Sequence, residues 1–463
     1  MSEIKVNKIS PRTNCGTTTL GDSGDSFVIP SGVTITNNGT QTGFGREGSV
    51  DWQTSSIKTT TFTATSGEGY FVDTSSGAVT CNLPAGSAGA IVAFADYTRT
   101  FNSNNLTISP NGSNKIGGIS ADAKLTVAGQ SATFVFVDST EGWINVQETQ
   151  SSQTGAVDFL AATGGTVTTS GDFKIHTFTS PGTFCVSQIS TVDTARNTLG
   201  YMVVAGGGGA ANSGAGGGGA GGYREGRNTP IDNFTASPLV ANAPTNAVTI
   251  TSAGGVPVTV GAGGTAAPVP TCANGGDGSA SVFSTITSTG GGGGAQRGGS
   301  GNPGGSGGGW GGSSGGHGDF GDGNTPPVSP AQGNNGGGPP GPGSAAICAG
   351  TGGGGATAGG SGWPGSRGVG TNGGAGATSS ITGSPVARAG GGGGGARTSP
   401  GPGSAGSGGT GGGGAGANGP GPCTSTPGTS GTVNTGGGGG GTGTNSPGGA
   451  GGSGIVVIRY KFQ

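Results

Sequence analysis

The residues able to do chemistry are few and scattered in this 463-residue chain. The segment 21–26, Gly-Asp-Ser-Gly-Asp-Ser, has the local form of a serine nucleophile segment, but a catalytic triad also needs a positioned histidine as its base. The candidates are His176, in an alternating strand-like segment, and His317, deep in a glycine-rich region. We therefore interpret 21–26 as a polar turn.

Paired carboxylates are the chemistry of a polysaccharide-cleaving protein, because glycosidases hold two of them several ångströms apart. After Tyr223 the acidic residues are sparse, and Asp319 and Asp322 are the sole local pair. A solvated turn or a cation-binding loop accounts for this pair better than catalysis does. We predict that the chain is not an enzyme.

The spacing of the cysteines argues against a metal site, and we predict no cofactor. No Cys-x-x-Cys pair occurs, and no glycine run is followed by Gly-Lys-Ser or Gly-Lys-Thr, which excludes a Walker phosphate loop. We interpret the cysteines as free or buried thiols, with a disulfide among Cys272, Cys348 and Cys423 as the alternative. The six cysteines are Cys15, Cys81, Cys185, Cys272, Cys348 and Cys423.

Large aromatic rings are rare in the glycine-rich half, where only Trp310, Phe320 and Trp363 occur between residues 291 and 459. Such rings either pack onto the scaffold or stand exposed at turns, where rigid rings beside glycine-rich segments form a good contact surface. Both interpretations stay open. In the second interpretation the candidate receptor-contact residues are Arg297, Trp310, His317, Asp319, Phe320, Trp363 and Arg367.

The region that positions these rings is dominated by glycine, since most of the 117 glycines follow residue 200. Runs such as 390–395 and 436–441 break any Gly-X-Y period and argue against collagen. Apolar, β-branched segments such as 256–260 and 455–462 argue against a plain linker.

Glycine permits a third arrangement, in which extended helices of the polyproline II type lie side by side. These helices have no internal hydrogen bonds, and chains without Cβ atoms approach closely enough to bond to one another. We predict a body of polyglycine II helices at 206–454, packed as a sandwich on a small β base formed by 166–205 and 455–463. We expect 455–460 to return beside 201–204, and no substantial α-helix.

The first 165 residues are predicted to form an all-β stalk. Segment 1–50 holds extended pieces too short to close a core in one chain, so we expect self-association there. Segment 51–150 has strand-like stretches at regular intervals with turns between them, which predicts a β-sandwich or barrel. Segment 151–165 is polar and small, as in a linker.

Composition excludes several partners. Charged residues make up 8% of the chain and the net charge is −2. We therefore expect no basic patch for binding nucleic acid. The chain has no signal-peptide pattern and no stretch of about 18 apolar residues, so we expect no membrane insertion.

Several segments together resemble the glycine-rich C-terminal domain of phage tail-fibre proteins. They are 201–209, 220–226, 258–264, 283–294 and 451–460. The domain is similar in kind to the adhesins at the tips of long tail fibres of T-even-like phages. In that family polyglycine II helices pack as a sandwich and loops at one end touch the host receptor. The resemblance covers roughly 166–463, and segment 51–150 resembles a spacer module in fibres of marine phages.

The resemblance implies a structural virion protein, made in the host cytoplasm, that attaches the phage to its bacterial host. It implies a homotrimer, docking of 1–50 onto another virion protein, and a surface receptor that is an outer-membrane protein or a glycan. The loops favoured for contact are 301–347, 361–388 and 397–430. The alternative is a structural or ice-binding protein, since such bundles also resemble one group of insect antifreeze proteins; a capsule depolymerase ranks third.

Overall fold

The computed structural model describes most of the chain after residue 49 and isolated positions before it. The main described ranges are 50–147, 159–190, 193–271, 273–313, 318–339, 349–366, 368–397, 403–419, 426–443 and 446–463. The expectations for 1–50, and for the first part of the linker at 151–158, fall outside the described residues. Contacts divide the chain into two compact units, Met1–Gly155 and Ala156–Gln463.

The predicted fold class is confirmed, because the regular structure of the described residues is β apart from the 3-10 helix Thr194–Asn197. No helix among those residues is long and apolar enough to cross a membrane.

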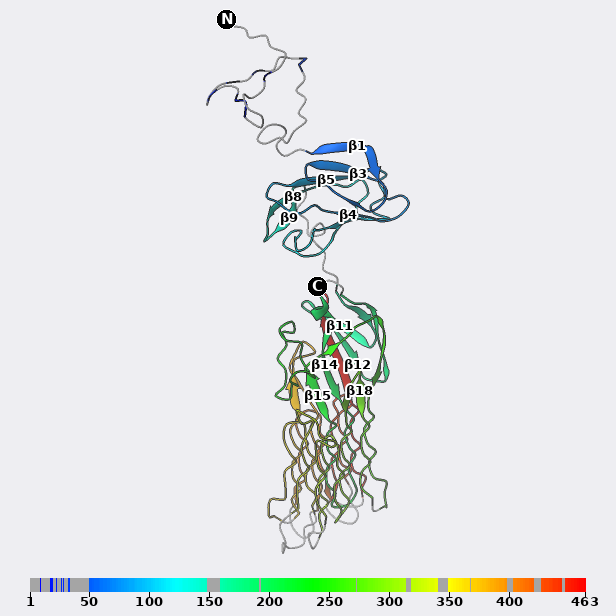
Figure 1. Ribbon diagram of the computed structural model, residues 1–463. Helices are drawn as coiled ribbons and strands as arrows, with labels where there is room; N and C mark the ends of the chain where they lie inside the picture. The colour runs from blue at the N-terminus through cyan, green and yellow to red at the C-terminus, as the bar shows by residue number, and fades with distance from the viewer. Residues whose placement is uncertain are drawn as a thin grey trace. The chain divides into compact units, whose positions relative to one another are not determined.

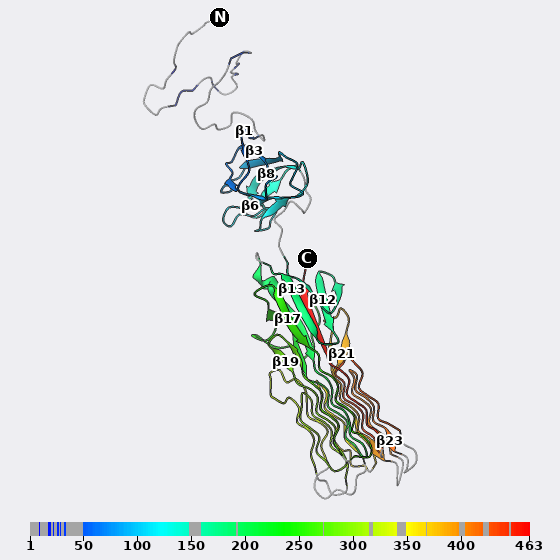
Figure 2. The ribbon, with the colours of Figure 1, turned by 90° about the vertical axis from the view of Figure 1, so that its right-hand side faces the viewer.

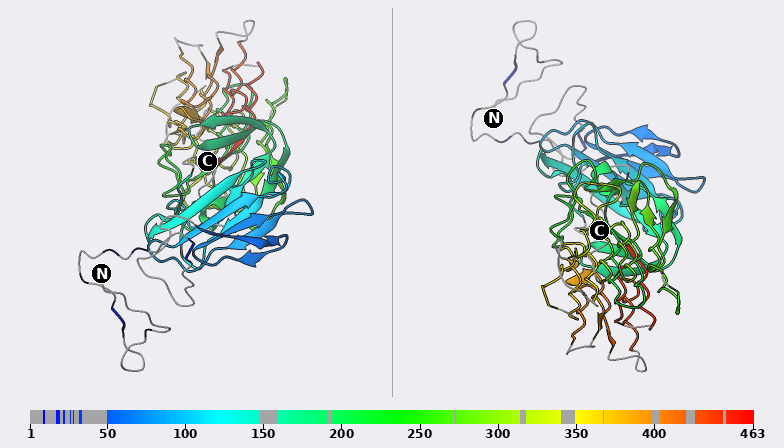
Figure 3. Two further views of the ribbon diagram at one scale, coloured as in Figure 1. Left: turned by 90° about the horizontal axis from the view of Figure 1, so that it is seen from above. Right: turned by 90° about the horizontal axis from the view of Figure 1, so that it is seen from below.

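The first unit is a short β-solenoid (Figure 1). The chain alternates between two sheets, with parallel neighbours along β1-β3-β5 and β2-β4-β6, and antiparallel strands complete each sheet. The strands are β1 (Asp51–Lys58), β2 (Phe62–Thr63), β3 (Glu68–Val72), β4 (Val79–Asn82), β5 (Ile91–Asp96), β6 (Leu106–Ser109), β7 (Ala123–Leu125), β8 (Ser131–Asp138) and β9 (Gly142–Asn145). In the left view of Figure 3 the strands of this unit are seen along their length, lying side by side.

Alternating side chains from both sheets fill one core in this unit. Tyr70, Phe94, Phe134 and Trp143 are among its buried rings. Cys81 is buried with them, and burial raises the pKa of its thiol to about 12. The two sheets face one another as in the predicted sandwich, but their parallel winding is a feature that the spacing of turns does not reveal.

The second unit begins with a β base of two sheets, ordered β10-β13-β17-β18-β19 and β11-β12-β24-β14-β15, with β16 beside β14. The bounds are β10 (Ala161–Thr163), β11 (Thr166–Ser170), β12 (Phe173–Phe178), β13 (Gly182–Gln188), β14 (Thr198–Val204), β15 (Tyr223–Gly226), β16 (Val248–Thr249), β17 (Gly254–Thr259), β18 (Ser281–Phe283), β19 (Ile286–Ser288) and β24 (Ile455–Lys461).

Strand β24 lies between β12 and β14, with Met202 opposite Val457. The predicted return of the chain's last strand beside 201–204 is therefore confirmed. Rings of Phe184, Phe283 and Tyr460 pack between the two sheets. Outside the base, the described residues of this unit form only short strand pairs, β20 (Ala377–Ser379) with β21 (Val386–Arg388) and β22 (Ala396–Arg397) with β23 (Asn418–Gly419).

The glycine body consists of extended runs that lie side by side and bond sideways (Figure 2). In the run 215–222, the backbone N–H groups of every third residue donate hydrogen bonds to the same neighbouring run. Gly216, Gly219 and Gly222 donate to residues 295, 292 and 289, whereas Gly217 and Ala220 donate to 351 and 354. Gly218 and Gly221 donate to 439 and 436. A period of three with no bond inside the run is the pattern of a polyglycine II helix.

The run 215–222 is surrounded by six others among the described residues. It donates to three runs and accepts hydrogen bonds from three more, again at a spacing of three. The neighbours are 205–208, 289–295, 306–312, 351–354, 392–395 and 436–439. All eight backbone N–H groups of this buried run, and six of its eight carbonyl oxygens, thus bond to the backbone of a neighbouring run.

Close approach is what excludes side chains from this central run. A Cβ added at Gly216, Gly217, Gly218 or Gly219 would overlap a carbonyl oxygen of a neighbouring run. Glycine is therefore required at these positions by the neighbouring backbones.

We expect Gly218→Ala to destabilise the second unit by at least about 2 kcal/mol, because the added methyl group forces the neighbouring run away. Gly362→Ala is the matched control, since a Cβ there meets its nearest atom, Gly338 O, at an ordinary 3.6 Å. Chemical denaturation of both variants measures the difference. Equal stability of the two variants would contradict the proposed packing.

His176 links three strands of the base while fully buried. Its Nδ1 lies 2.7 Å from Gly164 O, and because a carbonyl only accepts, Nδ1 carries the proton. Its Nε2 then accepts from the Tyr460 hydroxyl at 3.3 Å, and that oxygen accepts from Ala162 N at 3.1 Å. Burial is the main reason that the pKa of His176 lies below its ordinary value.

Acid is expected to destabilise the base through His176. The pKa of His176 is lower in the folded state than in the unfolded state. Its contribution to the free energy of unfolding is therefore fully present above the unfolded-state pKa and is lost as the pH falls through the folded-state pKa. Between about pH 7.5 and pH 5, wild type should lose more unfolding free energy than His176→Gln. Denaturation at both pH values checks this, and parallel losses would assign the acid sensitivity to other groups.

Candidate functional site

The candidate site lies at the end of the glycine body opposite the β base, which we call the distal end. The run 206–210 leaves strand β14 and the run 215–222 returns to β15, so the turn 211–214 marks that end. The turns 268–271, 296–300 and 364–366 also connect a run that leads away from the base with a run that returns to it, so they lie at the distal end as well (Figure 1).

Two of the predicted contact residues flank one distal turn. Arg297 is exposed in the turn 296–300, with its Cγ 3.7 Å from the position of a Cβ built on Gly214. Asp319 is also exposed, and its backbone N–H donates to Ser300 Oγ at 3.0 Å. The structure therefore places a cation and a carboxylate beside the same turn.

Two aromatic side chains that were predicted to contact a receptor lie against one glycine run near the distal end. Phe320 and Trp363 are half-buried, and both approach Gly338. A Cβ built on Gly338 would lie 3.1 Å from the Phe320 ring, and the Trp363 N–H donates to Gly338 O at 3.3 Å. Trp363 Nε1 also donates to Ser366 O at 3.0 Å, which fixes the ring. Part of each ring remains open to solvent.

The prediction that Trp310 contacts a receptor needs correction, because its side chain has no exposed surface. The ring packs with Ala349 and Trp363, and its backbone N–H donates to Thr351 Oγ1 at 2.8 Å. Trp310 therefore belongs to the scaffold. His317 and Arg367 fall outside the described residues.

Sequence reasoning missed one exposed cation at this end. Arg397 lies on β22, and its carbonyl oxygen is 2.6 Å from a Cβ built on Gly368, beside the turn 364–366. The sequence placed it within the favoured loop 397–430 but singled out no residue there. An arginine at the end of a long glycine run was the available signal.

Other charged groups are buried in the base, where they hold loops in place. The Arg459 guanidinium lies 3.7 Å from Asp232 Oδ1 and stacks 4.2 Å from the Phe173 ring centre. Burial raises the pKa of Asp232 to about 6. Glu225 accepts hydrogen bonds from Tyr223 Oη at 3.1 Å, from a backbone N–H and from a serine hydroxyl. Tyr223 itself is 1% exposed.

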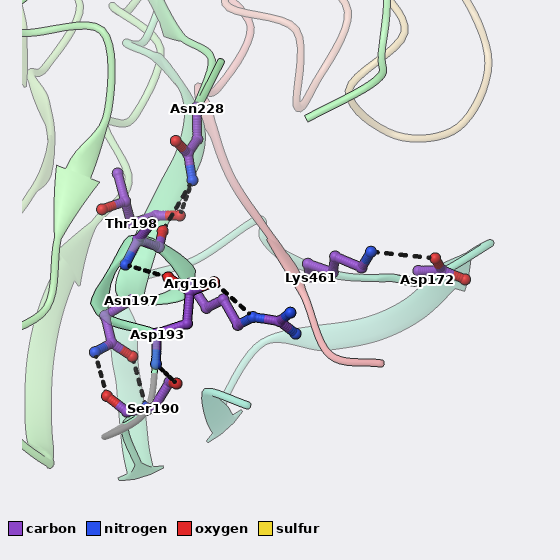
Figure 4. A network of polar contacts seen from close by, with 9 residues as sticks. Asp172, Ser190, Asp193, Arg196, Asn197, Thr198, Asn228 and Lys461 are labelled. Carbon is purple, nitrogen blue, oxygen red and sulfur yellow. Dashed lines mark hydrogen bonds and ion pairs between the residues drawn. The ribbon is translucent and has the colours of Figure 1, made fainter. Parts of the chain in front are cut away.

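A second polar network fixes the start of β14 (Figure 4). Asp193 pairs with Arg196 at 2.9 Å, and the Asn197 side chain bonds both backbone groups of Ser190. Asn228 Nδ2 donates to the carbonyl of the residue that opens β14, at 2.8 Å. These contacts brace the 3-10 helix and show no nucleophile beside a base.

The described residues contain no group of three His, Cys, Asp or Glu side chains able to hold a metal ion. An open hollow of about 430 Å³ lies between residues 164–166 and 177–183 of the base, and none of the side chains lining it titrates. The cysteines of the alternative disulfide, Cys272, Cys348 and Cys423, are outside the described residues, whereas Cys81 and Cys185 are free thiols.

The fold and the distal turns define an all-β, glycine-rich protein whose body is a bundle of polyglycine II helices. A family model described as a glycine-rich domain matches residues 179–461, and the chain belongs to that family. The match runs from the turn before β13 to β24, so it covers the body and the base without β10, β11 and β12. A comparison with curated proteins finds no match.

Proposed function

We propose that this protein is a structural virion protein, a phage tail fibre or fibre-tip adhesin, which recognises a receptor on the bacterial surface through its distal end. One observation carries the proposal: exposed Arg297, Asp319 and Arg397 and the half-exposed rings of Phe320 and Trp363 gather where rigid glycine runs turn. Contact residues on loops of a rigid scaffold are typical of binding proteins.

The lateral hydrogen bonds explain why such a scaffold suits binding. Turns anchored at both ends to bonded runs are already ordered, so they lose less conformational entropy when a receptor binds. In a homotrimer, which is part of the proposal together with docking of 1–50 onto another virion protein, three distal ends would add avidity. The receptor is an outer-membrane protein or a glycan.

Asp319 and Asp322 are both exposed, and Asp319 Oδ1 accepts a hydrogen bond from the backbone N–H of Phe320 at 2.8 Å. Exposed carboxylates on a rigid scaffold are available for contact with a partner, which supports binding.

An ice-binding function is the second candidate, because one surface of the body is regular. Thr426, Thr429 and Thr432 are exposed at a spacing of three, one on each turn of a run. Two runs away, exposed hydroxyls repeat at residues 404, 407 and 410. If this surface binds ice, the purified chain should show thermal hysteresis that Thr429→Tyr removes, and no hysteresis would exclude this candidate.

The adhesin proposal predicts that distal substitutions weaken attachment without unfolding the protein. Labelled full-length chain should bind cells of at least one member of a broad bacterial panel in flow cytometry. Arg297→Ala combined with Asp319→Ala should weaken that binding about tenfold or more, since charged contacts contribute on this scale.

The matched control is Lys174→Ala, which removes a cation from the base instead of the distal end. It should bind as wild type does, and all variants should melt as wild type does. The proposal fails if no bacterium is bound, or if the control loses binding as the distal variant does.

A further inference from the structure

Two buried threonine hydroxyls lie between neighbouring runs near the distal end. Thr351 and Thr371 are both buried, and each hydroxyl stands between an N–H of one run and a carbonyl of another. Thr371 follows the distal turn 364–366, and Thr351 bonds to Trp310, close to the distal turn 211–214. Most bonds between runs join backbone to backbone, so these two hydroxyls are exceptions that need a physical reason.

The Thr351 hydroxyl bridges two runs that lie too far apart to bond well directly. Trp310 N and Gly337 O are 3.4 Å apart, whereas the N–H groups of run 215–222 bond at 2.8 to 3.0 Å. Thr351 Oγ1 accepts a hydrogen bond from Trp310 N at 2.8 Å and donates one to Gly337 O at 2.6 Å. One long backbone contact is thus replaced by two short bonds, which fix the separation of the two runs.

The Thr371 hydroxyl makes the same kind of bridge to the run that carries Trp363. Its Oγ1 accepts from Gly352 N at 3.0 Å and donates to Ser361 O. Ser361 N in turn donates to the carbonyl of Asn372, the residue after Thr371, at 2.9 Å. Both backbone groups of Ser361 are therefore held two residues before the indole.

The two bridges hold the backbone on both sides of the ring pair in the candidate site. Gly337 precedes Gly338, which lies against the Phe320 ring and accepts a hydrogen bond from Trp363 N at 3.3 Å. The Trp363 ring packs on Trp310, whose N–H belongs to the first bridge. A change at either hydroxyl therefore reaches the exposed part of the Trp363 ring.

We propose that Thr351 and Thr371 are positioning residues of the distal contact surface, and that their buried hydroxyls fix the place of the Trp363 ring. Their role in binding rests on the proposed function, whereas the fixing of the ring does not. Because both threonines are buried, they act on a receptor only through the ring that they hold. A ring fixed before binding loses less conformational entropy when a receptor is bound.

Ser281 supplies a matched control, because it makes an equivalent bridge in the base. It is buried, and its Oγ accepts from Gly261 N at 2.9 Å and donates to Val204 O at 2.8 Å. Ser281 opens strand β18, at the end of the glycine body opposite the distal turns. Ser281→Ala therefore removes one bridging hydroxyl from the same unit without touching the distal end.

Hydroxyl-radical oxidation of Trp363 in the full-length chain, read by mass spectrometry, tests the positioning role. Thr371→Val keeps the shape of the side chain but removes the partner of Gly352 N and Ser361 O. Oxidation of Trp363 should rise at least about threefold, because unpaired buried polar groups favour a looser arrangement of the two runs.

Three further variants accompany this measurement, all at a temperature where circular dichroism shows them folded. Thr351→Val should also raise the oxidation of Trp363, and it replaces Thr371→Val if that variant does not fold. Thr371→Ser retains the hydroxyl and should restore the wild-type rate. Ser281→Ala should leave the rate as in wild type, although it too loses a buried hydroxyl bridge.

Cell binding in flow cytometry separates this inference from the proposed function. If the chain is an adhesin, Thr371→Val should weaken binding about tenfold, since the ring contributes to the contact, while Thr371→Ser and Ser281→Ala bind as wild type does. A wild-type chain that binds no bacterium overturns the proposed function, and a raised oxidation of Trp363 in Thr371→Val then still supports the fixing of the ring.

Three results would overturn the positioning role. The first is an unchanged oxidation of Trp363 in Thr371→Val. The second is an equal rise in Ser281→Ala, because general loosening of the unit gives that result. The third is a changed ring with unchanged cell binding, which removes the threonines from recognition.

Discussion

The second unit depends on one interaction, the hydrogen bond between backbones of neighbouring glycine runs. In an ordinary domain apolar side chains fill the interior, and secondary structure satisfies the backbone internally. Here the run 215–222 is interior and has almost no side chains, so each of its bonds points to another run. Stability and tight packing both come from the absence of Cβ atoms, and the β base supplies the conventional core that aligns the runs.

The two ends of this body consequently have different chemistry. At the base, buried groups such as Arg459, Glu225 and His176 are fixed by many partners and serve to join loops and strands. At the distal end, side chains stand on turns with few constraints on their identity. Variation of the turns leaves the interior bonds untouched, which is the property that a surface for recognition requires.

Much of this architecture could be predicted from local patterns in the sequence. The rest depends on contacts between segments that are far apart in the chain. Broken glycine runs and the apolar segments 201–204 and 455–460 predict the body, the base and their closure, because period and composition are local. Burial of Trp310 was not predictable, since Ala349 and Trp363 reach it from other runs. The parallel winding of the first unit was also missed, because the pairing of β1 with β3 and of β3 with β5 joins segments that are separated along the chain.

The position of the central run in the chain has a consequence for biosynthesis. Run 215–222 is bonded to 436–439, and β14 is paired with β24, so an early segment needs partners that are made more than two hundred residues later. Contacts of such long sequence separation slow folding. A ribosome-bound chain that ends before residue 436 holds glycine runs with unpaired backbones. The second unit therefore completes its folding only after the final strand has left the ribosome, in one late step.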